Sequence, residues 1–309
     1  MARSKRKIGQ KKITIIVLIL CFIISLLLTI SPKDSPFSWK KIFEGMKSPS
    51  SPAIVTDSED SIHFIDVGQG DCTLLVSGDN AALIDCGENG SGKGVTKYLK
   101  SLGIESLDFL IFSHHDSDHI GGADEILEKI PVKNIYTDLV PNPKDNESFN
   151  DVKRVCKSKG TEILIPKNLQ EISLGSMVLK FYIPTPKDRD DENENGIVVM
   201  ADVWGSQVLF TGDIGTNTEK MLIEEYPNLD CDILKVGHHG SKYSSDKDFL
   251  KTITPEYSVI SVGADNSYGH PTTEALTRLS KVNSKIYRTD TLGTVVFEFD
   301  KNGAFAPAS

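Results

Sequence analysis

From residue 62 onward, the chain alternates short apolar runs with helical patterns, and this alternation predicts its architecture. Apolar runs of four to eight residues are typical of strands, and longer stretches with apolar residues three or four positions apart are typical of helices. Predicted strands occupy residues 62–67, 72–76, 81–84, 107–112, 177–183, 197–204, 207–211, 231–236, 257–262, 285–288 and 294–299. Predicted helices occupy residues 96–102, 123–129, 216–225, 246–252 and 272–281. Strands interleaved with helices in this way favour two packed sheets with helices on both outer faces.

The preceding part of the chain has a different character. Residues 1–12 are rich in Lys and Arg, and residues 13–30 form an uncharged apolar run, close to the ~18–20 residues that span a bilayer as a helix. Residues 31–61 are rich in Ser, Pro and Lys and indicate a spacer. Basic flanks stay in the cytoplasm, so the sequence predicts a single-pass protein of the cell membrane whose domain, residues 62–309, is extracytoplasmic. A cleaved signal peptide, which gives a secreted protein, is the alternative.

The run Ser-His-His-Asp-Ser-Asp-His follows the strand predicted at residues 107–112, and four of its side chains are candidate metal ligands. They are His114, Asp116, Asp118 and His119. Alternate side chains point the same way where a strand passes into a loop, so the first three converge from one side. Imidazole and carboxylate groups bind ions such as Zn²⁺ and Mn²⁺, and four of them exceed the needs of one closed structural site. A solvated polar loop is the alternative interpretation.

Two later strand ends strengthen the metal interpretation. Asp213 follows the strand at residues 207–211 in Thr-Gly-Asp. His238 and His239 follow the strand at residues 231–236 in Gly-His-His-Gly-Ser. Three strands that end on such residues predict a site for two divalent ions.

Together, the motifs His-x-Asp-x-Asp-His, Thr-Gly-Asp and His-His-Gly-Ser, preceded by Phe-Ile-Asp-Val-Gly-Gln-Gly-Asp and Ile-Asp-Cys-Gly, resemble the metallo-β-lactamase fold superfamily. Within it, the chain is similar to the metallohydrolase domain of the ComEC/Rec2 DNA-uptake proteins. It differs from them in having nothing that forms their polytopic membrane channel. The resemblance implies a four-layer αββα sandwich of the α/β class with two divalent metal ions. It also implies a phosphodiesterase or nuclease that acts on DNA.

The resemblance also implies roles for the ligands. His114 and Asp116 hold the first ion, Asp118 and His119 hold the second, and Asp213 bridges the two. Asp118 also orients the attacking water.

This chain departs from the wider superfamily pattern at two points. Asp116 stands where many members have a histidine, and no histidine occurs between His119 and His238. A ligand that the superfamily draws from that interval is therefore missing, which leaves the first ion open to water or to a polar substitute such as Asn195. More oxygen and less nitrogen shifts the preference toward harder ions, so Mn²⁺ competes with Zn²⁺.

The tandem histidines are expected to have different roles, because adjacent side chains diverge. His238 comes directly after the strand and is assigned to the second ion. His239 is assigned to the leaving group or the phosphate. His270, in Tyr-Gly-His-Pro, is a second candidate for catalysis, with a surface histidine as the alternative.

Other polar residues are expected to assist. The predicted substrate contacts are Ser241, Lys242 and Asn266, with a plain surface lysine as the alternative for the second. The carboxylates predicted to support the ligands from behind are Asp66, Asp71 and Asp85. The glycines of Gly-Gln-Gly allow that loop to approach the site closely. The aromatic residues Phe181, Tyr182 and Trp204 are interpreted as core or groove residues, so no array for stacking on nucleic-acid bases is expected.

Composition narrows the possible substrates. The formal net charge of −9 argues against a broad electrostatic grip on nucleic acid, although a local contact is compatible with it. The second hypothesis is therefore that the substrate is a phosphorylcholine or teichoic-acid ester of the cell surface. A binding module without catalysis is the third, and a β-lactam substrate fits the motifs less well. No protein partner can be deduced. Cys72 and Cys86 lie in neighbouring predicted strands, and buried free thiols are preferred there over a disulfide.

Overall fold

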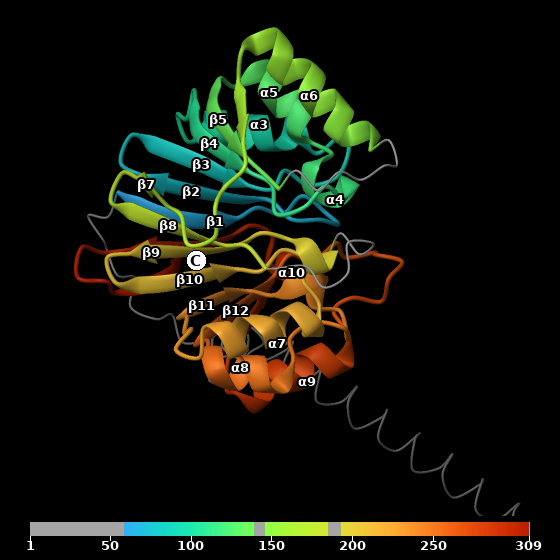
Figure 1. Ribbon diagram of the computed structural model, residues 1–309, viewed down its shortest axis with the longest axis vertical. Coiled ribbons are helices and arrows are strands. Elements are labelled where there is room, and N and C mark those ends of the chain that lie inside the picture. Colours follow the sequence, from blue (N-terminus) through green and yellow to red (C-terminus); the bar gives the residue numbers. More distant parts are fainter. Residues whose placement is uncertain (1–58, 139–145, 185–192, 309) are drawn as a thin grey trace, which may run out of the picture. The chain divides into compact units, whose positions relative to one another are not determined.

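The computed structural model describes residues 59–138, 146–184 and 193–308, which form two β-sheets packed face to face (Figure 1). In spatial order, the strands of the first sheet are β15 (Phe305–Ala308), β14 (Val295–Phe299), β1 (Asp60–Phe64), β2 (Thr73–Ser77), β3 (Asn80–Ile84), β4 (Leu107–Ile111), β5 (Val132–Tyr136) and β6 (Glu162–Leu164). The strands of the second sheet are β13 (Lys285–Arg288), β12 (Tyr257–Ile260), β11 (Ile233–Lys235), β10 (Ser206–Phe210), β9 (Val198–Val203), β8 (Met177–Tyr182) and β7 (Glu171–Leu174).

Helices cover the outer face of each sheet (Figure 1). Those over the first sheet are α3 (Gly92–Ser101), α5 (Ala123–Lys129) and α6 (Glu147–Lys159). Those over the second sheet are α7 (Thr216–Glu225), α8 (Lys247–Ile253) and α9 (Thr273–Lys281). Short helical turns in the connections are α4 (Ser117–Ile120), η1 (Asn193–Asn195), η2 (Gly237–Gly240) and α10 (Thr289–Leu292). The layers run helix, sheet, sheet, helix, which confirms the predicted αββα sandwich.

The inner faces of the two sheets form the central core. Phe64 of β1, Phe181 of β8, Phe210 of β10 and Phe297 of β14 are buried there. The rings of Phe64 and Phe297 meet edge to face, with centroids 6.2 Å apart. Burial of each such side chain contributes about 1.5–3 kcal/mol relative to exposure. The two sheets are therefore a rigid frame for the loops at their ends.

Both sheets contain a parallel block, and these blocks decide where the predicted ligands lie. β3, β4, β5 and β6 run parallel in the first sheet. β10, β11, β12 and β13 run parallel in the second. The carboxyl ends of parallel strands meet at one edge of a sheet, where ligands of α/β proteins bind. In Figure 1, α4 after β4 and α10 after β13 lie on the same side of the molecule, so loops of both sheets meet at this edge.

The predicted elements are present with small shifts at their ends, and the first strand begins at Asp60 rather than at residue 62. Between residues 130 and 176, however, the structure has β5, α6, β6 and β7, which the apolar pattern does not predict. Helix α6 does have the end signals of a helix. The Asn146 side chain accepts a hydrogen bond from the Phe149 N–H at 3.0 Å, and Gly160 ends the helix with a φ of 73°.

Several sequence-based predictions fall outside the described residues. These are the basic segment at residues 1–12, the anchor at 13–30 and most of the spacer at 31–61. In the part of the chain that the structure describes, no helix has both the length and the apolar character to cross a membrane.

The cysteines of the described residues are free thiols. Cys72 and Cys86 are both buried and unpaired, which confirms the preference for thiols over a disulfide between them. Burial raises the pKa of each thiol well above its ordinary value, so both behave as small apolar side chains.

Candidate metal centre

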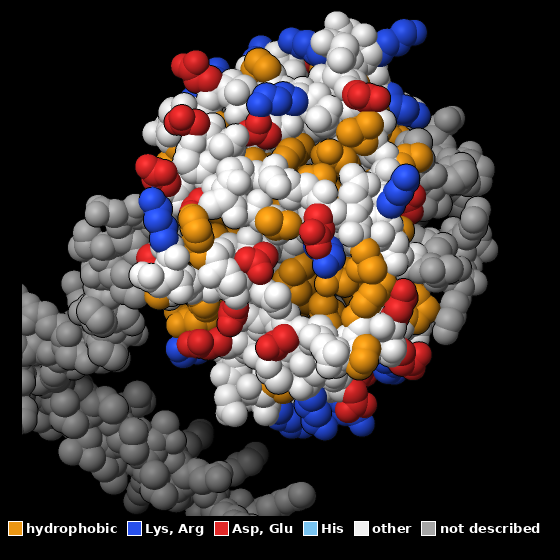
Figure 2. Space-filling view, turned by 60° about the vertical axis from the view of Figure 1, so that its left-hand side comes forward, with side chains coloured by type: hydrophobic (Ala, Val, Ile, Leu, Met, Phe, Trp, Pro, Cys, Tyr) orange, Lys and Arg blue, Asp and Glu red, His pale blue; other side chains and the backbone are white. Residues whose placement is uncertain are grey.

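Histidines and carboxylates from both sheets gather at the shared edge. Ligand atoms of His114, His119 and Asp213 all lie within 4.8 Å of one another, and so do those of Asp118, His119 and His239. Because the two groups share His119, they form one continuous cluster. Figure 2 brings the left-hand side of Figure 1 forward, and no described histidine is visible on that face. The cluster therefore belongs to the edge formed by the carboxyl ends of the strands.

His114 follows β4 and is oriented by Ser113. The Ser113 hydroxyl donates to Asp85 at 2.7 Å and lies 3.0 Å from Nδ1 of His114. Asp85 also accepts the Ser113 backbone N–H at 2.8 Å. The hydroxyl can therefore accept from Nδ1–H, and this tautomer leaves the Nε2 lone pair free to bind an ion. These contacts fit the supporting role predicted for Asp85.

His119 of α4 is buried between two carboxylates. Its Nδ1 lies 2.9 Å from Asp85, and its Nε2 lies 3.3 Å from Asp213. Burial lowers the pKa of His119, but the charges of Asp213 and Asp85 outweigh it and raise this pKa well above its ordinary value. Burial raises the pKa of Asp213, whereas His239 and His119 lower it well below the usual range. Imidazolium and carboxylate are thus paired where a divalent cation could also bind.

The Gly-Gln-Gly loop approaches the cluster through its backbone, as predicted. Gly70 has a φ of 118°, and a Cβ at this position would lie 2.2 Å from the Asp118 carbonyl oxygen. The Asp71 N–H donates to the same oxygen at 3.0 Å. Only glycine allows this approach, which fixes the backbone of Asp118.

Asp71 is buried beside Lys235, a residue that the sequence motifs do not single out. Lys235 ends β11 and is 2% exposed, and its Nζ lies 2.7 Å from Asp71 and 2.8 Å from the Val236 carbonyl oxygen. The other Asp71 oxygen lies 3.3 Å from Nδ1 of His239. Burial raises the pKa of Asp71, but Lys235 and His239 lower it to about 2. A lysine inside the apolar run Asp-Ile-Leu-Lys-Val is a signal for such a buried ion pair.

The tandem histidines of η2 take different positions. The buried His239 donates through Nδ1 to the Ser261 carbonyl oxygen at 2.9 Å. Its Nε2 lies 3.1 Å from Asp118 and 3.5 Å from Asp213. The side chain of His238 is 32% exposed, and its Nε2 lies 3.8 Å from Asp213. The geometry thus groups His239 with the ligands and leaves His238 facing solvent, the reverse of the assignment expected from the sequence.

A left-handed turn accounts for this exchange. His238 has φ 49° and ψ 47°, His239 has φ 52° and ψ 25°, and Gly240 has φ 81°. Non-glycine residues in this region cost about 1–3 kcal/mol each and persist where the surroundings impose them. The two rings diverge as expected, with planes at 87° and centroids 6.2 Å apart. The turn, however, directs the second ring rather than the first into the cluster.

Several buried ligand atoms of the cluster have no hydrogen-bond partner. These are Nε2 of His114, Nε2 of His119 and Oδ1 of Asp213. A buried polar atom without a partner costs about 1–3 kcal/mol, so three of them at one point indicate a missing ligand. Imidazole nitrogen and carboxylate oxygen suit Zn²⁺ or Mn²⁺. The residues present therefore fit a divalent metal centre.

Asp116 and Asn195 lie on the His114 side of the cluster. Asp116 is half exposed and lies 3.5 Å from Nε2 of His114, although it is not among the groups within 4.8 Å. The adjacent His114 ring lowers the pKa of Asp116. Asn195 is buried in η1, and the nearby Ile197 N–H donates to the Ser113 carbonyl oxygen at 2.7 Å.

Asn266 closes the loop that presents His270. Its Nδ2 donates to the carbonyl oxygens of Gly263 at 2.8 Å and His270 at 2.7 Å, and its Oδ1 accepts the His270 N–H at 3.0 Å. The amide is thus engaged within the loop. The His270 ring lies 5.7 Å from that of His238, and burial together with His238 lowers its pKa.

Other predicted residues are placed outside the cluster. Ser241 is buried and its hydroxyl accepts the Tyr243 N–H at 3.3 Å, whereas Lys242 is exposed. Asp66 is exposed and accepts the Gly68 N–H at 3.1 Å in its own loop.

His115 faces away from the cluster. Its Nε2 lies 2.8 Å from the Thr137 hydroxyl, and its ring stacks on Phe149 with centroids 4.1 Å apart. Burial lowers the pKa of His115 to about 4, so this ring is neutral and packs as part of the core.

The fold and the cluster together define a class of protein. The sequence model of the metallo-beta-lactamase superfamily matches residues 65–264, a range that includes the whole cluster. The chain therefore belongs to the metallo-beta-lactamase superfamily. The metallo-beta-lactamase fold protein YhfI from Bacillus subtilis is similar in structure, with a TM-score of 0.51 over 81% of this chain and 100% of that chain. Its sequence identity is 14%, so this likeness shows the fold.

Three curated relatives are competence or recombination proteins by name. The chain is 30% identical over 276 residues to ComE operon protein 3 of Bacillus subtilis, covering 81% of this chain and 34% of that protein. It is 32% identical over 257 residues to competence protein ComA of Neisseria gonorrhoeae, covering 82% of this chain and 34% of that protein. It is 31% identical over 246 residues to recombination protein 2 of Haemophilus influenzae, covering 77% of this chain and 29% of that protein. The resemblance to the ComEC/Rec2 proteins is confirmed, and the chain spans about a third of their length.

Proposed function

We propose that the domain is a metal-dependent phosphodiesterase that cleaves DNA. The observation that carries this proposal is the buried cluster around His119, whose unpartnered ligand atoms meet at the carboxyl ends of both sheets. Similarity to the named competence proteins supports DNA as the substrate. The complete cluster weighs against the third hypothesis, a binding module that has lost catalysis.

Two divalent ions, Zn²⁺ or Mn²⁺, are assigned to the cluster. Asp213 is placed between them, because it lies 3.3 Å from His119 and 3.5 Å from His239. When bound, such ions lower the pKa of water and stabilise charge on the oxygens of a phosphodiester. The proposed ligands, in chain order, are His114, Asp116, Asp118, His119, Asp213 and His239.

In two of the proposed ligand histidines, a hydrogen-bond partner of Nδ1 orients the ring, so that Nε2 is the ligand atom. Asp85 holds Nδ1 of His119, and the Ser261 carbonyl oxygen holds Nδ1 of His239. Both rings therefore present Nε2 to the cluster. Partners of this kind fix the tautomer and the ring orientation of metal-binding histidines.

Two further histidines are placed to act on the substrate. His238 is partly exposed at the edge of the cluster and can exchange a proton with the leaving oxygen. The pKa of His270 is lowered, so its neutral ring donates a hydrogen bond and orients a phosphate oxygen. Lys242 is exposed four residues after His238, and its ammonium suits a contact with the phosphate backbone.

One observation favours the second hypothesis, in which the substrate is an ester of a cationic alcohol such as choline. A polar cavity of about 570 Å³ adjoins Asp116, and Glu147 and Asp151 also line it. Three carboxylates around one cavity attract a cationic group. None of the described residues that line this cavity is aromatic, although such rings are typical of quaternary-ammonium sites.

Hydrolysis by the full chain, loaded with Mn²⁺ or Zn²⁺, tests the proposal. The substrates are single-stranded DNA, duplex DNA, bis-p-nitrophenyl phosphate and p-nitrophenyl phosphorylcholine. We expect cleavage of DNA and of bis-p-nitrophenyl phosphate, and loss of both after chelation. The Glu147→Gln/Asp151→Asn double variant is expected to cleave DNA at the unaltered rate. Hydrolysis of the phosphorylcholine ester alone, lost in this double variant, would overturn the nuclease assignment.

We further propose that residues 13–30 anchor the chain in the cell membrane with residues 62–309 outside the cytoplasm. The cluster of Lys and Arg in residues 1–12 supports this orientation. Protease added to intact protoplasts is expected to degrade the domain. Full protection would contradict the orientation, and a mature form that begins near residue 31 would indicate a cleaved signal peptide instead.

A further inference from the structure

A row of aromatic rings leads outward from the metal centre on the side of the second sheet. The ring of His238 meets that of His270 edge to face, with centroids 5.7 Å apart. The ring of Tyr268 lies nearly parallel to His270, at 23° and 5.9 Å. Tyr268 is 67% exposed, so its other face is open to solvent. The row thus runs from Asp213, 3.8 Å from His238, to an open aromatic face.

A second exposed ring, that of Tyr243, lies on the loop after η2. Tyr243 is 66% exposed, and the Lys242 ammonium lies 4.9 Å from the centroid of its ring. The loop is held firmly, because Arg278 donates to the carbonyl oxygens of Lys242 at 2.9 Å and Ser244 at 2.8 Å. The Thr216 N–H also donates to the Tyr243 carbonyl oxygen at 2.8 Å. Tyr243 is therefore a second exposed ring, presented by a fixed loop that directly follows η2.

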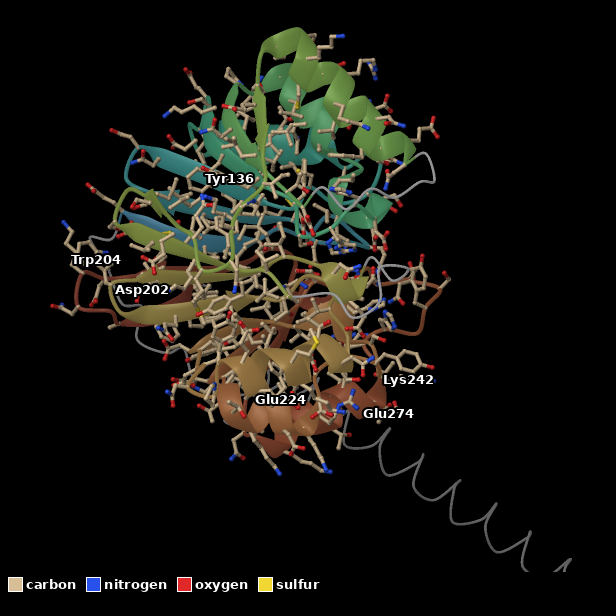
Figure 3. All side chains as sticks on the ribbon, viewed as in Figure 1. Tyr136, Asp202, Trp204, Glu224, Lys242 and Glu274 are labelled. Atoms are coloured by element: carbon tan, nitrogen blue, oxygen red, sulfur yellow. The ribbon has the colours of Figure 1, made fainter. Side chains whose placement is uncertain are left out.

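The two sides of the metal centre differ in charge. On the side of the first sheet, Asp116, Glu147 and Asp151 line the polar cavity and repel a phosphate backbone. On the side of the second sheet, the Lys242 ammonium lies beside Tyr243. Figure 3 shows Lys242 at the right-hand edge of the molecule with Glu274 next to it, so the charge there is mixed. A phosphate backbone is therefore repelled less on the side of the tyrosines than on the side of the cavity.

We propose that Tyr268, backed by His270, and Tyr243 form a stacking subsite for unpaired nucleobases next to the scissile phosphate. This inference rests on the proposed function and names its substrate class as single-stranded nucleic acid. Aromatic side chains bind single strands of any sequence because every base has a π-face. In a duplex, both faces of a base are covered by its neighbours, so the subsite selects against paired DNA. The expectation of no stacking array concerns Phe181, Tyr182 and Trp204, whereas the proposed subsite uses two other aromatic residues.

Fluorescence anisotropy of the full chain, after removal of metal ions with EDTA, tests the subsite without hydrolysis. The probes are an oligothymidine of roughly 12 nucleotides and an abasic oligomer with the same number of phosphates. We expect Tyr268→Ala to weaken oligothymidine binding roughly 5- to 100-fold, with no change for the abasic probe. Tyr268→Phe is expected to keep the affinity of the unaltered chain, because it keeps the ring.

Trp204→Ala is the matched control. Trp204 is 41% exposed and lies at the opposite edge of the molecule from Lys242 in Figure 3, so its removal is expected to leave both affinities unchanged. Equal binding of oligothymidine by Tyr268→Ala and the unaltered chain would overturn the subsite, whether or not DNA is cleaved. If the unaltered chain needs Tyr268 for oligothymidine binding but hydrolyses no phosphodiester, the proposed function fails and the subsite stands.

Discussion

Asp213→Asn is expected to remove at least one metal ion per chain and to lower phosphodiester turnover by about 10³-fold or more. Asp213 is 3% exposed and belongs to two ligand groups, one with His114 and His119 and the other with Asp71 and His239. Loss of its charge removes the ligand between the two ions and the several kcal/mol of transition-state stabilisation that they supply, equivalent to roughly 10³-fold in rate.

Metal analysis after dialysis, together with the hydrolysis assay, measures both effects. Asp202→Asn is the matched control, because Asp202 accepts the Gly205 N–H at 2.9 Å and lies at the opposite edge of the molecule from Lys242 (Figure 3). The control is expected to keep two ions per chain. One ion per chain in the unaltered protein, still present in Asp213→Asn, would refute the position of Asp213 between two ions.

His239→Ala is expected to lower metal affinity by about 100-fold or more, whereas His238→Ala keeps the metal and loses turnover. The first substitution removes a ligand nitrogen that faces Asp118 and Asp213, and the loss of supporting partners alone costs 10–100-fold in other metal sites. The second removes a proton donor at the edge of the cluster, which costs roughly 10²–10⁴-fold in rate.

Calorimetric titration with Mn²⁺ and Zn²⁺ distinguishes the two variants, and circular dichroism verifies that each is folded. His115→Ala provides a comparison for the loss of a buried ring outside the site, because His115 contacts Thr137 and Phe149. It is expected to bind metal like the unaltered chain. Metal loss in His238→Ala with normal binding in His239→Ala would restore the assignment expected from the sequence.

The sequence predicts the fold well because most of its apolar runs coincide with strands of the parallel blocks. Most ligands then follow from where these strands end, since His114 and Asp213 come shortly after a strand and His119 lies in the short helix α4 that follows β4. The roles of His238 and His239 depend on a left-handed turn, and nothing in Gly-His-His-Gly-Ser specifies its direction. Backbone dihedrals of this kind arise from tertiary contacts, which a single sequence does not display.

Other features were missed because their signals are weak or local. Helix α6 has few apolar positions, and its Asn146 cap stands out only once the helix is known. Asn266 looks like a substrate contact from its place in a Gly-rich loop, but its amide is engaged within that loop. Tyr268 and Tyr243 are separated by many residues, and only the fold brings both to one side of the metal centre.

The buried ion pair between Lys235 and Asp71 bears on when the ions are needed. Burial lowers the pKa of His239, yet Asp213 and Asp71 raise it to about 10, so at neutral pH this ring holds a proton when no ion is bound. The Lys235 ammonium lies beside Asp71, so the charges of Asp71 and Asp213 are balanced by cations that the chain itself provides, Lys235 and the protonated His239. We therefore expect the chain to fold without bound metal. Bound ions would replace these protons, so acidification is expected to release the ions while the fold persists.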